Sequence, residues 1–386
     1  MTIGDAIREL LQTAFRLLPW PTEPGLRSVG SPGPLSPVIV TGNYDLTVRR
    51  LVRALEGVDA WLVVAPSSGI NVWCAAAGGL LGTHQVVTAL KTSGVEDVVE
   101  HHRAILPQLA ATGVIARDVM HRCGWRVRFG PVYAADIPRY LEGGQKKGGR
   151  ERDTTNAAAG DDMRRVRFGG QERLEMAASM GLPLALVAGL LALWLQPSFA
   201  LPLSLLALLV AVSHFFVYDR IPAQPGLVFA GTTAIFALAV VLAMDGGAAA
   251  LVTAAFASLA FCGVLSYDHA GMTPIAGGAH FEQTRWNIAL DLERCDGVYS
   301  CWEVCPEACF EKRDDVRKVA LAHEERCVRC GACVVQCPQD ALFFENEQGE
   351  RIEPEEIRRF KLNLLGSRTV AAAPGPEVGE PTPPQA

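Results

Sequence analysis

The feature that most constrains this fold is a block of four apolar runs between two polar halves. Short polar turns separate the runs, which cover residues 181–195, 199–217, 226–244 and 248–265. The last three approach the ~20 residues needed to cross a bilayer, and the first leads directly into a proline-containing turn. A chain with this block cannot form one globular unit. We therefore predict a transmembrane domain of four helices at residues 179–267, with the lipid bilayer as its surroundings.

Basic residues gather in the charged linker at residues 142–178, before the first run, and Arg220 follows the second run. By the positive-inside rule, an even number of spans then places both soluble parts in the cytoplasm, with the protein a multi-pass component of the cytoplasmic (inner) membrane. The acidic balance, with a net charge of −6 and a pI near 5.8, provides no dominating basic face. This excludes nucleic acid as an expected partner.

Eight of the eleven cysteines lie near the C-terminal end, in a segment predicted to be an α+β bacterial dicluster ferredoxin domain at residues 268–350. One run, ending in Cys-Pro, has the bacterial ferredoxin spacing, in which three ligands hold one cubane and the fourth holds the other. It consists of Cys327, Cys330, Cys333 and Cys337. A zinc site is the alternative, but the trailing proline and a second, partner run favour iron–sulfur clusters.

The partner run keeps Cys295, Cys301 and Cys305 but has Val298 where the second ligand belongs. Crossed ligation then gives Cys305 to the complete [4Fe-4S] cluster of Cys327, Cys330 and Cys333. The second cluster, at Cys295, Cys301 and Cys337, lacks one ligand. It is predicted as a [3Fe-4S] or labile [4Fe-4S] cluster, unless Cys309 bends in as the fourth ligand or the cluster is lost. Residues 351–386 are predicted as a helix, at 353–366, followed by a disordered tail from 371.

The first half of the chain opens with an amphipathic helix and a proline-rich linker at residues 1–36. From residue 37 to 141, apolar strand patterns alternate with helical patterns, which predicts an α/β domain with a mostly parallel sheet. The expected strands are 38–41, 61–65, 98–101 and 126–129, and the expected helices are 46–55, 72–81, 84–92 and 113–123. Ligands in such folds bind beyond the carboxyl ends of the strands.

Cys74 follows the carboxyl end of one of these strands. Asn71 occupies an N-cap position, so Cys74 lies in the first helical turn, where free N–H groups and the helix dipole favour a thiolate. The small residues at 75–79 would let a flat cofactor approach the backbone. The alternative is a small buried cysteine on a packing helix.

Residues 69–76 read Gly-Ile-Asn-Val-Trp-Cys-Ala-Ala, and this run resembles the cap-helix signature of the corrinoid protein of microbial mercury methylation. That family's corrinoid domain is related to the corrinoid iron–sulfur protein of the acetyl-CoA pathway. The resemblance extends over roughly residues 37–141 and implies that Cys74 is the lower axial ligand of cobalt. It also implies cofactor contacts from Asn71, Val72, Trp73, Cys74, Ala75, Ala76, Gly78 and Thr83. One departure is Gly78, which stands where the family signature has lysine.

The cysteine-rich end resembles the dicluster ferredoxin that partners this corrinoid protein. That partner usually ends in a cysteine pair, whereas no cysteine follows Cys337 here. The two resemblances together imply a membrane-bound corrinoid-dependent methyltransferase with a fused ferredoxin electron donor and Hg(II) as methyl acceptor. Its implied partners are a separate methyl-donor protein, a methylated-pterin-dependent methyltransferase, and an upstream electron donor.

Two other functions fit parts of this pattern. A related corrinoid protein could transfer methyl groups to a different acceptor in one-carbon metabolism, which Gly78 and the missing cysteine pair favour. A membrane iron–sulfur electron-transfer protein without corrinoid is the second, and it requires the buried-cysteine interpretation of Cys74.

Overall fold

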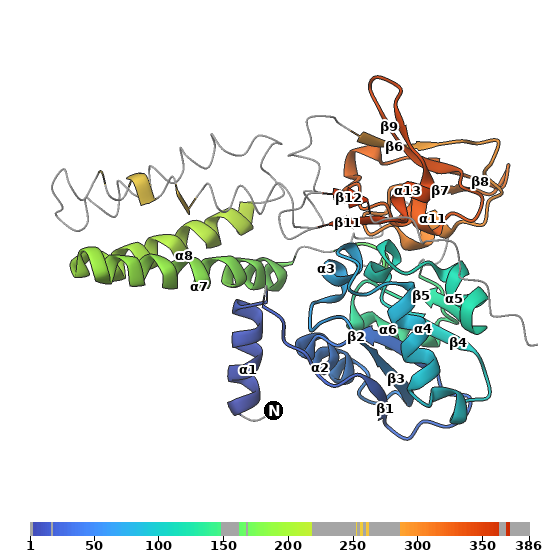
Figure 1. Ribbon diagram of the computed structural model, residues 1–386, viewed down its shortest axis with the longest axis horizontal. Coiled ribbons are helices and arrows are strands. Elements are labelled where there is room, and N and C mark those ends of the chain that lie inside the picture. The colour runs from blue at the N-terminus through green and yellow to red at the C-terminus, as the bar shows by residue number, and fades with distance from the viewer. Residues whose placement is uncertain are drawn as a thin grey trace, which may run out of the picture.

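The computed structural model describes residues 3–16, 18–147, 162–166, 169–217, 286–362 and 368–370, together with six residues between 252 and 261. Figure 1 shows an α/β domain, a pair of long helices beside it, and an iron–sulfur module packed against the α/β domain. This arrangement confirms the prediction of a multidomain chain with an N-terminal α/β domain and a C-terminal cysteine-rich domain.

The α/β domain contains a five-stranded sheet in the order β1-β3-β2-β4-β5. Its central strands β2, β3, β4 and β5 run parallel, whereas β1 pairs antiparallel with β3. The strands are β1 (Gly25–Val29), β2 (Val38–Gly42), β3 (Ala60–Ala65), β4 (Arg103–Leu106) and β5 (Arg126–Phe129). The helices between them are α2 (Asp45–Ala54), α3 (Val72–Ala77), α4 (Thr83–Thr92), α5 (Ala116–Cys123) and α6 (Ile137–Glu142).

Helices cover both faces of this sheet, as its buried strand residues require. On one face, alternate residues such as Val40 and Leu106 pack with α3, α4 and α5. On the other face, residues such as Ile39 and Leu62 pack with α2 and with Ile137 of α6. Short 3-10 turns complete the domain: η1 (Val95–Asp97), η2 (Gln108–Thr112) and η3 (Ala134–Asp136).

The structure corrects two parts of the sequence interpretation in this domain. Residues 25–29 lie in the predicted linker, yet they form β1, so the domain begins before residue 37. The strand expected at 98–101 is instead β4, five residues later. Val99 is buried against the core from a loop, and the continuous buried run Ala104, Ile105 and Leu106 is the one that enters the sheet.

Two helices, α7 (Gly170–Leu195) and α8 (Ala200–Val217), pack against each other across the short turn η4 (Pro197–Phe199). Among the described residues, these two are long and apolar enough to cross a membrane. Their outward faces expose large apolar side chains, including Trp194 at 82%. The predicted spans at 226–244 and 248–265 lie largely outside the described residues, although Phe261 packs against this helical pair.

The base of the helical pair is tied to the α/β domain. Arg50 of α2 forms two hydrogen bonds to the Glu175 carboxylate of α7, at 2.9 and 3.0 Å. Arg173 donates to the carbonyls of Phe215 and Phe216, which places both helix ends at this base. The helix α1 (Ile3–Ala14) also contacts α7. Helix α7 therefore begins inside the segment 142–178 that was predicted as a linker.

The iron–sulfur module has a three-stranded sheet of β6 (Trp286–Leu290), β9 (Leu342–Asn346) and β10 (Arg351–Ile352) and a hairpin of β7 (Phe310–Arg313) and β8 (Lys318–Leu321). Its short helices are α11 (Ser300–Val304), α12 (Ala332–Gln336) and α13 (Pro354–Ile357), and η6 (Glu324–Arg326) precedes the second cysteine run. A second hairpin, of β11 (Phe360–Leu362) and β12 (Arg368–Val370), follows.

The helix predicted at 353–366 is therefore wrong for residues 358–362, and residues 363–366 lie outside the described part of the chain. Arg358, which follows α13, donates to the Cys337 carbonyl and to Asp340, and the chain then enters β11. Figure 1 shows β11 and β12 beside α3 of the α/β domain. The tail predicted from residue 371 lies outside the described residues.

The short helix α3 packs directly on η2 because Gly113 has no side chain. A Cβ at Gly113 would lie 2.9 Å from the Leu81 carbonyl oxygen and closer still to that of Ala76. Both neighbours are backbone atoms, so α3 or η2 would have to shift to admit a methyl group. The position of α3, and of Cys74 on it, thus depends on this close approach.

Gly113→Ala should destabilise the α/β domain by about 1–3 kcal/mol, the usual cost of forcing extra volume into a packed site. Urea unfolding followed by tryptophan fluorescence measures this loss. Gly33→Ala is the matched control, because a Cβ there meets nothing within 4 Å. Equal stability of the two variants would show that α3 does not rest on this contact.

Candidate functional site

Cys74 lies in the first turn of α3, directly after the carboxyl end of β3. Asn71 is the N-cap, and its side-chain oxygen accepts the Cys74 backbone N–H at 3.0 Å. The Cys74 side chain is partly exposed. The predicted N-cap and first-turn geometry is therefore present, with the N-terminal peptide groups of the helix oriented to favour negative charge on the thiol.

The loop before α3 is fixed by a single buried amide. The Asn43 side-chain oxygen accepts hydrogen bonds from the backbone N–H groups of Ser67 and Gly69 and from the Ser67 hydroxyl, at 2.8 to 3.1 Å. Asn43 follows β2, so the ends of two neighbouring strands are joined at this edge of the sheet. This arrangement holds α3 at the strand ends.

A hollow of about 270 Å³ opens beside α3 at the carboxyl ends of β2, β4 and β5. It is mostly apolar, and the loops that follow β4 and β5 contribute Pro107, Pro131 and Tyr133. Asn71, Val72 and Trp73 of the cap segment also line it. Its place at the strand ends is the position expected for a ligand in a parallel α/β sheet.

The other predicted cofactor contacts divide into two groups. Trp73, Ala77 and Gly78 are partly exposed, as Cys74 is, on the accessible side of α3. Ala75 and Ala76 are at most 1% exposed and face the core, and the Thr83 hydroxyl accepts the Ile115 N–H at 2.9 Å. The structure therefore leaves Trp73, Cys74 and Gly78 partly exposed, and gives Ala75, Ala76 and Thr83 structural partners. Of the three partly exposed residues, Trp73 lines the hollow, whereas Cys74 and Gly78 are not part of its lining.

Lys361 of β11 packs on the C-terminal end of α3, a contact that the sequence analysis missed. Gly79 has a φ of +78°, and a Cβ there would lie 2.7 Å from the Lys361 Nζ. Burial lowers the pKa of this lysine. The chain thus places a lysine beside the end of α3, next to Gly78, although α3 itself has none.

Five of the predicted iron ligands line one buried cavity in the iron–sulfur module. They are Cys305, Cys309, Cys327, Cys330 and Cys333. The cavity is enclosed and bordered by Gly331, and four of its thiols are those assigned to the complete cluster. No three His, Cys, Asp or Glu side chains in the described part of the chain converge closely enough for a single metal ion. Four thiols around one shared cavity are the donor set that a [4Fe-4S] cluster requires.

The remaining predicted ligands form a second group. Burial, and then the neighbouring Cys337 and Cys295, raise the pKa of Cys301 to about 12. Val298, which stands at the missing ligand position, lines a shared hollow with Cys337. Cys309 instead lies against Cys305, whose sulfur accepts the Cys309 N–H at 3.3 Å, and its side chain contacts Cys305 and Cys327. The structure thus places Cys309 with the first group.

The iron–sulfur module docks on η2, the same turn on which α3 packs. Gln336, at the end of α12, donates to the carbonyls of Ala111 and Val114 at 2.8 and 2.7 Å. Its side-chain oxygen accepts the Ala116 N–H at 3.2 Å. Because Gln336 lies between Cys333 and Cys337, the second cysteine run is fixed to the segment behind Cys74.

A buried polar cluster completes this interface. The Gln108 amide of η2 donates to the carbonyls of Arg164 and Val304, and Lys147 donates to the Gln108 side-chain oxygen and the Glu303 carbonyl. Arg164 stacks over the Trp302 ring, 3.8 Å from its centroid. Lys147 and Arg164 lie in the predicted linker, so sequence reasoning missed them. Both are nevertheless less than 10% exposed.

Comparison with known proteins agrees with this division of the chain. Residues 6–141 match the family model of the CO dehydrogenase/acetyl-CoA synthase delta subunit. Residues 322–343 match the model of the 4Fe-4S binding domain. The first match includes β1, in agreement with the sheet. The chain therefore combines a domain like those of the corrinoid iron–sulfur protein family with a ferredoxin motif.

Among curated proteins, the gamma subunits of acetyl-CoA decarbonylase/synthase complexes are similar to the first part of this chain. The Methanopyrus kandleri subunit is 35% identical over 126 residues, which cover 32% of this chain and 27% of the relative. The Methanothermobacter thermautotrophicus subunit is 36% identical over 128 residues, 32% of this chain and 27% of the relative. The chain thus spans about a quarter of the length of these relatives.

The pH dependence of stability tests the interface cluster. Burial lowers the pKa of Lys147 from 10.5 to about 7, with Arg164 lowering it further and Glu303 and Asp162 opposing the shift. Between these values the unfolded chain binds the proton more tightly, so raising the pH stabilises the folded protein, by up to about 1.4 kcal/mol per pH unit. Below pH 7 the amine is protonated in both the folded and the unfolded chain, so Lys147 no longer makes stability depend on pH. Lys147→Met should remove the rise in unfolding free energy between pH 7 and 9, and a slope equal to that of the wild type would contradict this assignment.

A second prediction concerns Val298. A cysteine there would share a hollow with Cys337 and complete the second ligand set, so Val298→Cys should raise the iron content toward about eight per chain from about seven. Anaerobic iron analysis with electron paramagnetic resonance measures both clusters. Because Cys309 lies with the first group, Cys309→Ser should leave the second cluster intact. Loss of the second cluster in Cys309→Ser would show that Cys309 is its missing ligand.

Proposed function

We propose that this chain is a membrane-bound corrinoid-dependent methyl carrier whose fused ferredoxin supplies the electrons for methyl transfer. The observation that carries the proposal is the shared support of the two sites. The turn η2 contacts both α3, which bears Cys74, and α12, which bears Cys333. One rigid segment thus joins the candidate cofactor site to the candidate cluster site.

Cys74 is the residue proposed to hold the corrinoid, because its thiolate could bind the cobalt of that cofactor. Its partial exposure beside the strand-end hollow, and the small exposed residues Ala77 and Gly78, fit a flat cofactor lying along α3. When bound, a corrinoid supplies a cobalt that carries a methyl group between donor and acceptor. The Asn71 cap orients the turn that bears Cys74, and a thiolate there would donate electron density to the bound metal.

The thiols of the first group would hold a [4Fe-4S] cluster, and Cys295, Cys301 and Cys337 a [3Fe-4S] or labile [4Fe-4S] cluster. Both runs contact η2 through their helices, since α11 and α12 both pack against it. Covalent fusion and this docking give the donor a high effective concentration at the corrinoid. An upstream electron donor would then need to reduce only the clusters.

The exposed apolar faces of α7 and α8 support placement of this pair in a bilayer. Side chains such as Leu190, Trp194 and Leu201 are more than half exposed, and an apolar surface of this kind is costly in water. The N-terminal end of α7 and the C-terminal end of α8 both lie at the base, where Arg50 and Glu175 form an ion pair. The α/β domain and the iron–sulfur module would then face the same, cytoplasmic side.

The proposed acceptor is Hg(II), as the resemblance of the cap segment implies, and the methyl group would come from a separate pterin-dependent protein. Lys361 beside Gly79 offers a basic group next to the position where the family signature has lysine. The absence of cysteines after Cys337 favours a second candidate, transfer to another acceptor in one-carbon metabolism. The named relatives, subunits of acetyl-CoA decarbonylase/synthase complexes, also support that candidate.

The test is Cys74→Ala in the full-length protein. This change should preserve the fold, shift the visible bands of the bound corrinoid and abolish methyl transfer, because alanine offers no ligand atom. The matched control is Cys123→Ala: its thiol is also partly buried in the α/β domain, but it only donates to the Val119 carbonyl. That control should keep the wild-type spectrum and activity.

A Cys74→Ala protein with an unchanged spectrum and full activity would contradict ligation by Cys74. Methyl transfer to Hg(II) in a deletion strain complemented with the wild-type chain tests the acceptor. A chain that binds corrinoid yet fails this assay belongs to the second candidate.

A further inference from the structure

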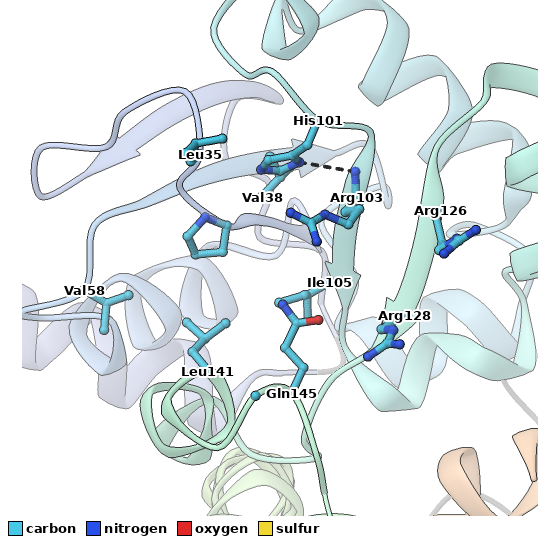
Figure 2. Close-up of a pocket in the computed structure, with 13 residues that line it drawn as sticks. Leu35, Val38, Val58, His101, Arg103, Ile105, Arg126, Arg128, Leu141 and Gln145 are labelled. Carbon is cyan, nitrogen blue, oxygen red and sulfur yellow. Dashed lines mark hydrogen bonds between the residues drawn. The ribbon is translucent and has the colours of Figure 1, made fainter.

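A second and larger hollow, of about 650 Å³, lies at the amino-terminal ends of the parallel strands. Its lining includes Val38 at the start of β2, Arg103 at the start of β4 and Arg126 at the start of β5. Figure 2 shows Arg103, Arg126 and Arg128 around one side of this hollow. Cys74 belongs to the opposite, carboxyl-terminal edge of the sheet, and Ile105 borders both hollows.

Three arginines occupy the sheet face where apolar residues would normally be expected. On β5, Val127 and Phe129 point to the buried core, whereas the alternate residues Arg126 and Arg128 are exposed. Arg103 of β4 is paired directly with Arg126 in the parallel register. Like charges opposite one another on neighbouring strands destabilise a sheet, so this arrangement has a cost that an anion would remove.

Among the residues that the structure describes, the lining of the hollow carries no negative charge. None of its lining residues is acidic, and no ion pair involves Arg103, Arg126 or Arg128 within the described part of the chain. This contrasts with the arginines of α2, since Arg49, Arg50 and Arg53 all pair with carboxylates. The three guanidinium groups therefore remain available to a ligand.

The rest of the wall is built around these groups. The His101 Nδ1 accepts the Arg103 N–H, and its Nε2 lies 3.0 Å from the Ser36 carbonyl oxygen, so the ring links the start of β4 to the loop before β2. Leu35, Val58 and Leu141 form an apolar side. Gln145 has a φ of +62°, an uncommon conformation for a residue other than glycine, and its side chain enters the hollow from below in Figure 2.

We propose that this hollow binds an organic phosphate of nucleotide size. Arginine forks match phosphate oxygens in paired hydrogen bonds, and three arginines line this hollow. The volume is within the range of small-molecule sites, and the apolar side suits a planar or hydrocarbon body attached to the phosphate. The site is separate from Cys74 and goes beyond the proposed methyl transfer, because its occupation requires neither corrinoid nor clusters.

Isothermal titration of the full-length protein with ADP, pyrophosphate and adenosine tests this site. ADP should bind saturably and more weakly as salt is raised, since the contacts are ionic. Pyrophosphate should bind more weakly than ADP, and adenosine should not bind.

Arg103→Gln and Arg128→Gln should each weaken ADP binding by about tenfold, or about 1.4 kcal/mol. Arg122→Gln, an exposed arginine on α5 outside the hollow, should bind ADP as the wild type does.

Because the substituted arginines are exposed and their mutual repulsion is relieved, the variants should unfold at or above the thermal midpoint of the wild type, and this measurement checks that they fold. Absence of ADP binding, or equal affinity for ADP and adenosine, would overturn the proposal. Wild-type affinity in both hollow variants would overturn it as well. Pyrophosphate binding as tightly as ADP would overturn the assignment to an organic phosphate.

Discussion

Two glutamine side chains, the buried Gln108 and the partly buried Gln336, hold the candidate sites of this protein together. Gln336 donates to two carbonyls at the η2 segment of the α/β domain, and Gln108 donates from η2 to a carbonyl of the iron–sulfur module. Each amide satisfies backbone groups that would otherwise be buried without partners, so removing either would leave costly unpaired carbonyls. These pairings therefore allow one relative position of the two domains. The position of α3 relative to both cysteine runs depends on it.

The main free-energy penalty of this interface comes from Lys147, whose amine is buried between the two domains. Burial disfavours its charged form, and only the Gln108 side chain and the Glu303 carbonyl accept its hydrogen bonds in the described structure. A hydrophobic residue would pack there without this penalty. We infer that the polar cluster sets the orientation of the iron–sulfur module more than its stability. This fits a protein in which electron transfer depends on a fixed geometry.

The sequence predicted the α/β domain because its strand and helix periods are strong and local, and it predicted the cap of α3 because Asn71 and Cys74 interact within one turn. The thiol groups were predictable from spacing alone. Long-range contacts were not. β1 lies in a proline-rich segment whose pattern is weak, and it becomes a strand only by pairing with β3. Lys147, Arg164 and Lys361 are polar residues in segments without periodicity, and tertiary contacts alone bring them to the sites. Arg126 and Arg128 alternate with core residues of β5, a strand that the sequence predicted, but the hollow beside them depends on contacts between distant segments.

The central claim is that one chain holds an electron donor and a corrinoid in fixed proximity. The most direct measurement is anaerobic stopped-flow reduction of the corrinoid-loaded protein, with the iron–sulfur and corrinoid absorption bands followed separately. Because η2 joins the two sites, oxidation of the clusters and reduction of the corrinoid should proceed with a single rate constant that is independent of protein concentration. A rate that rises in proportion to protein concentration would mean that electrons pass between molecules and would contradict this account.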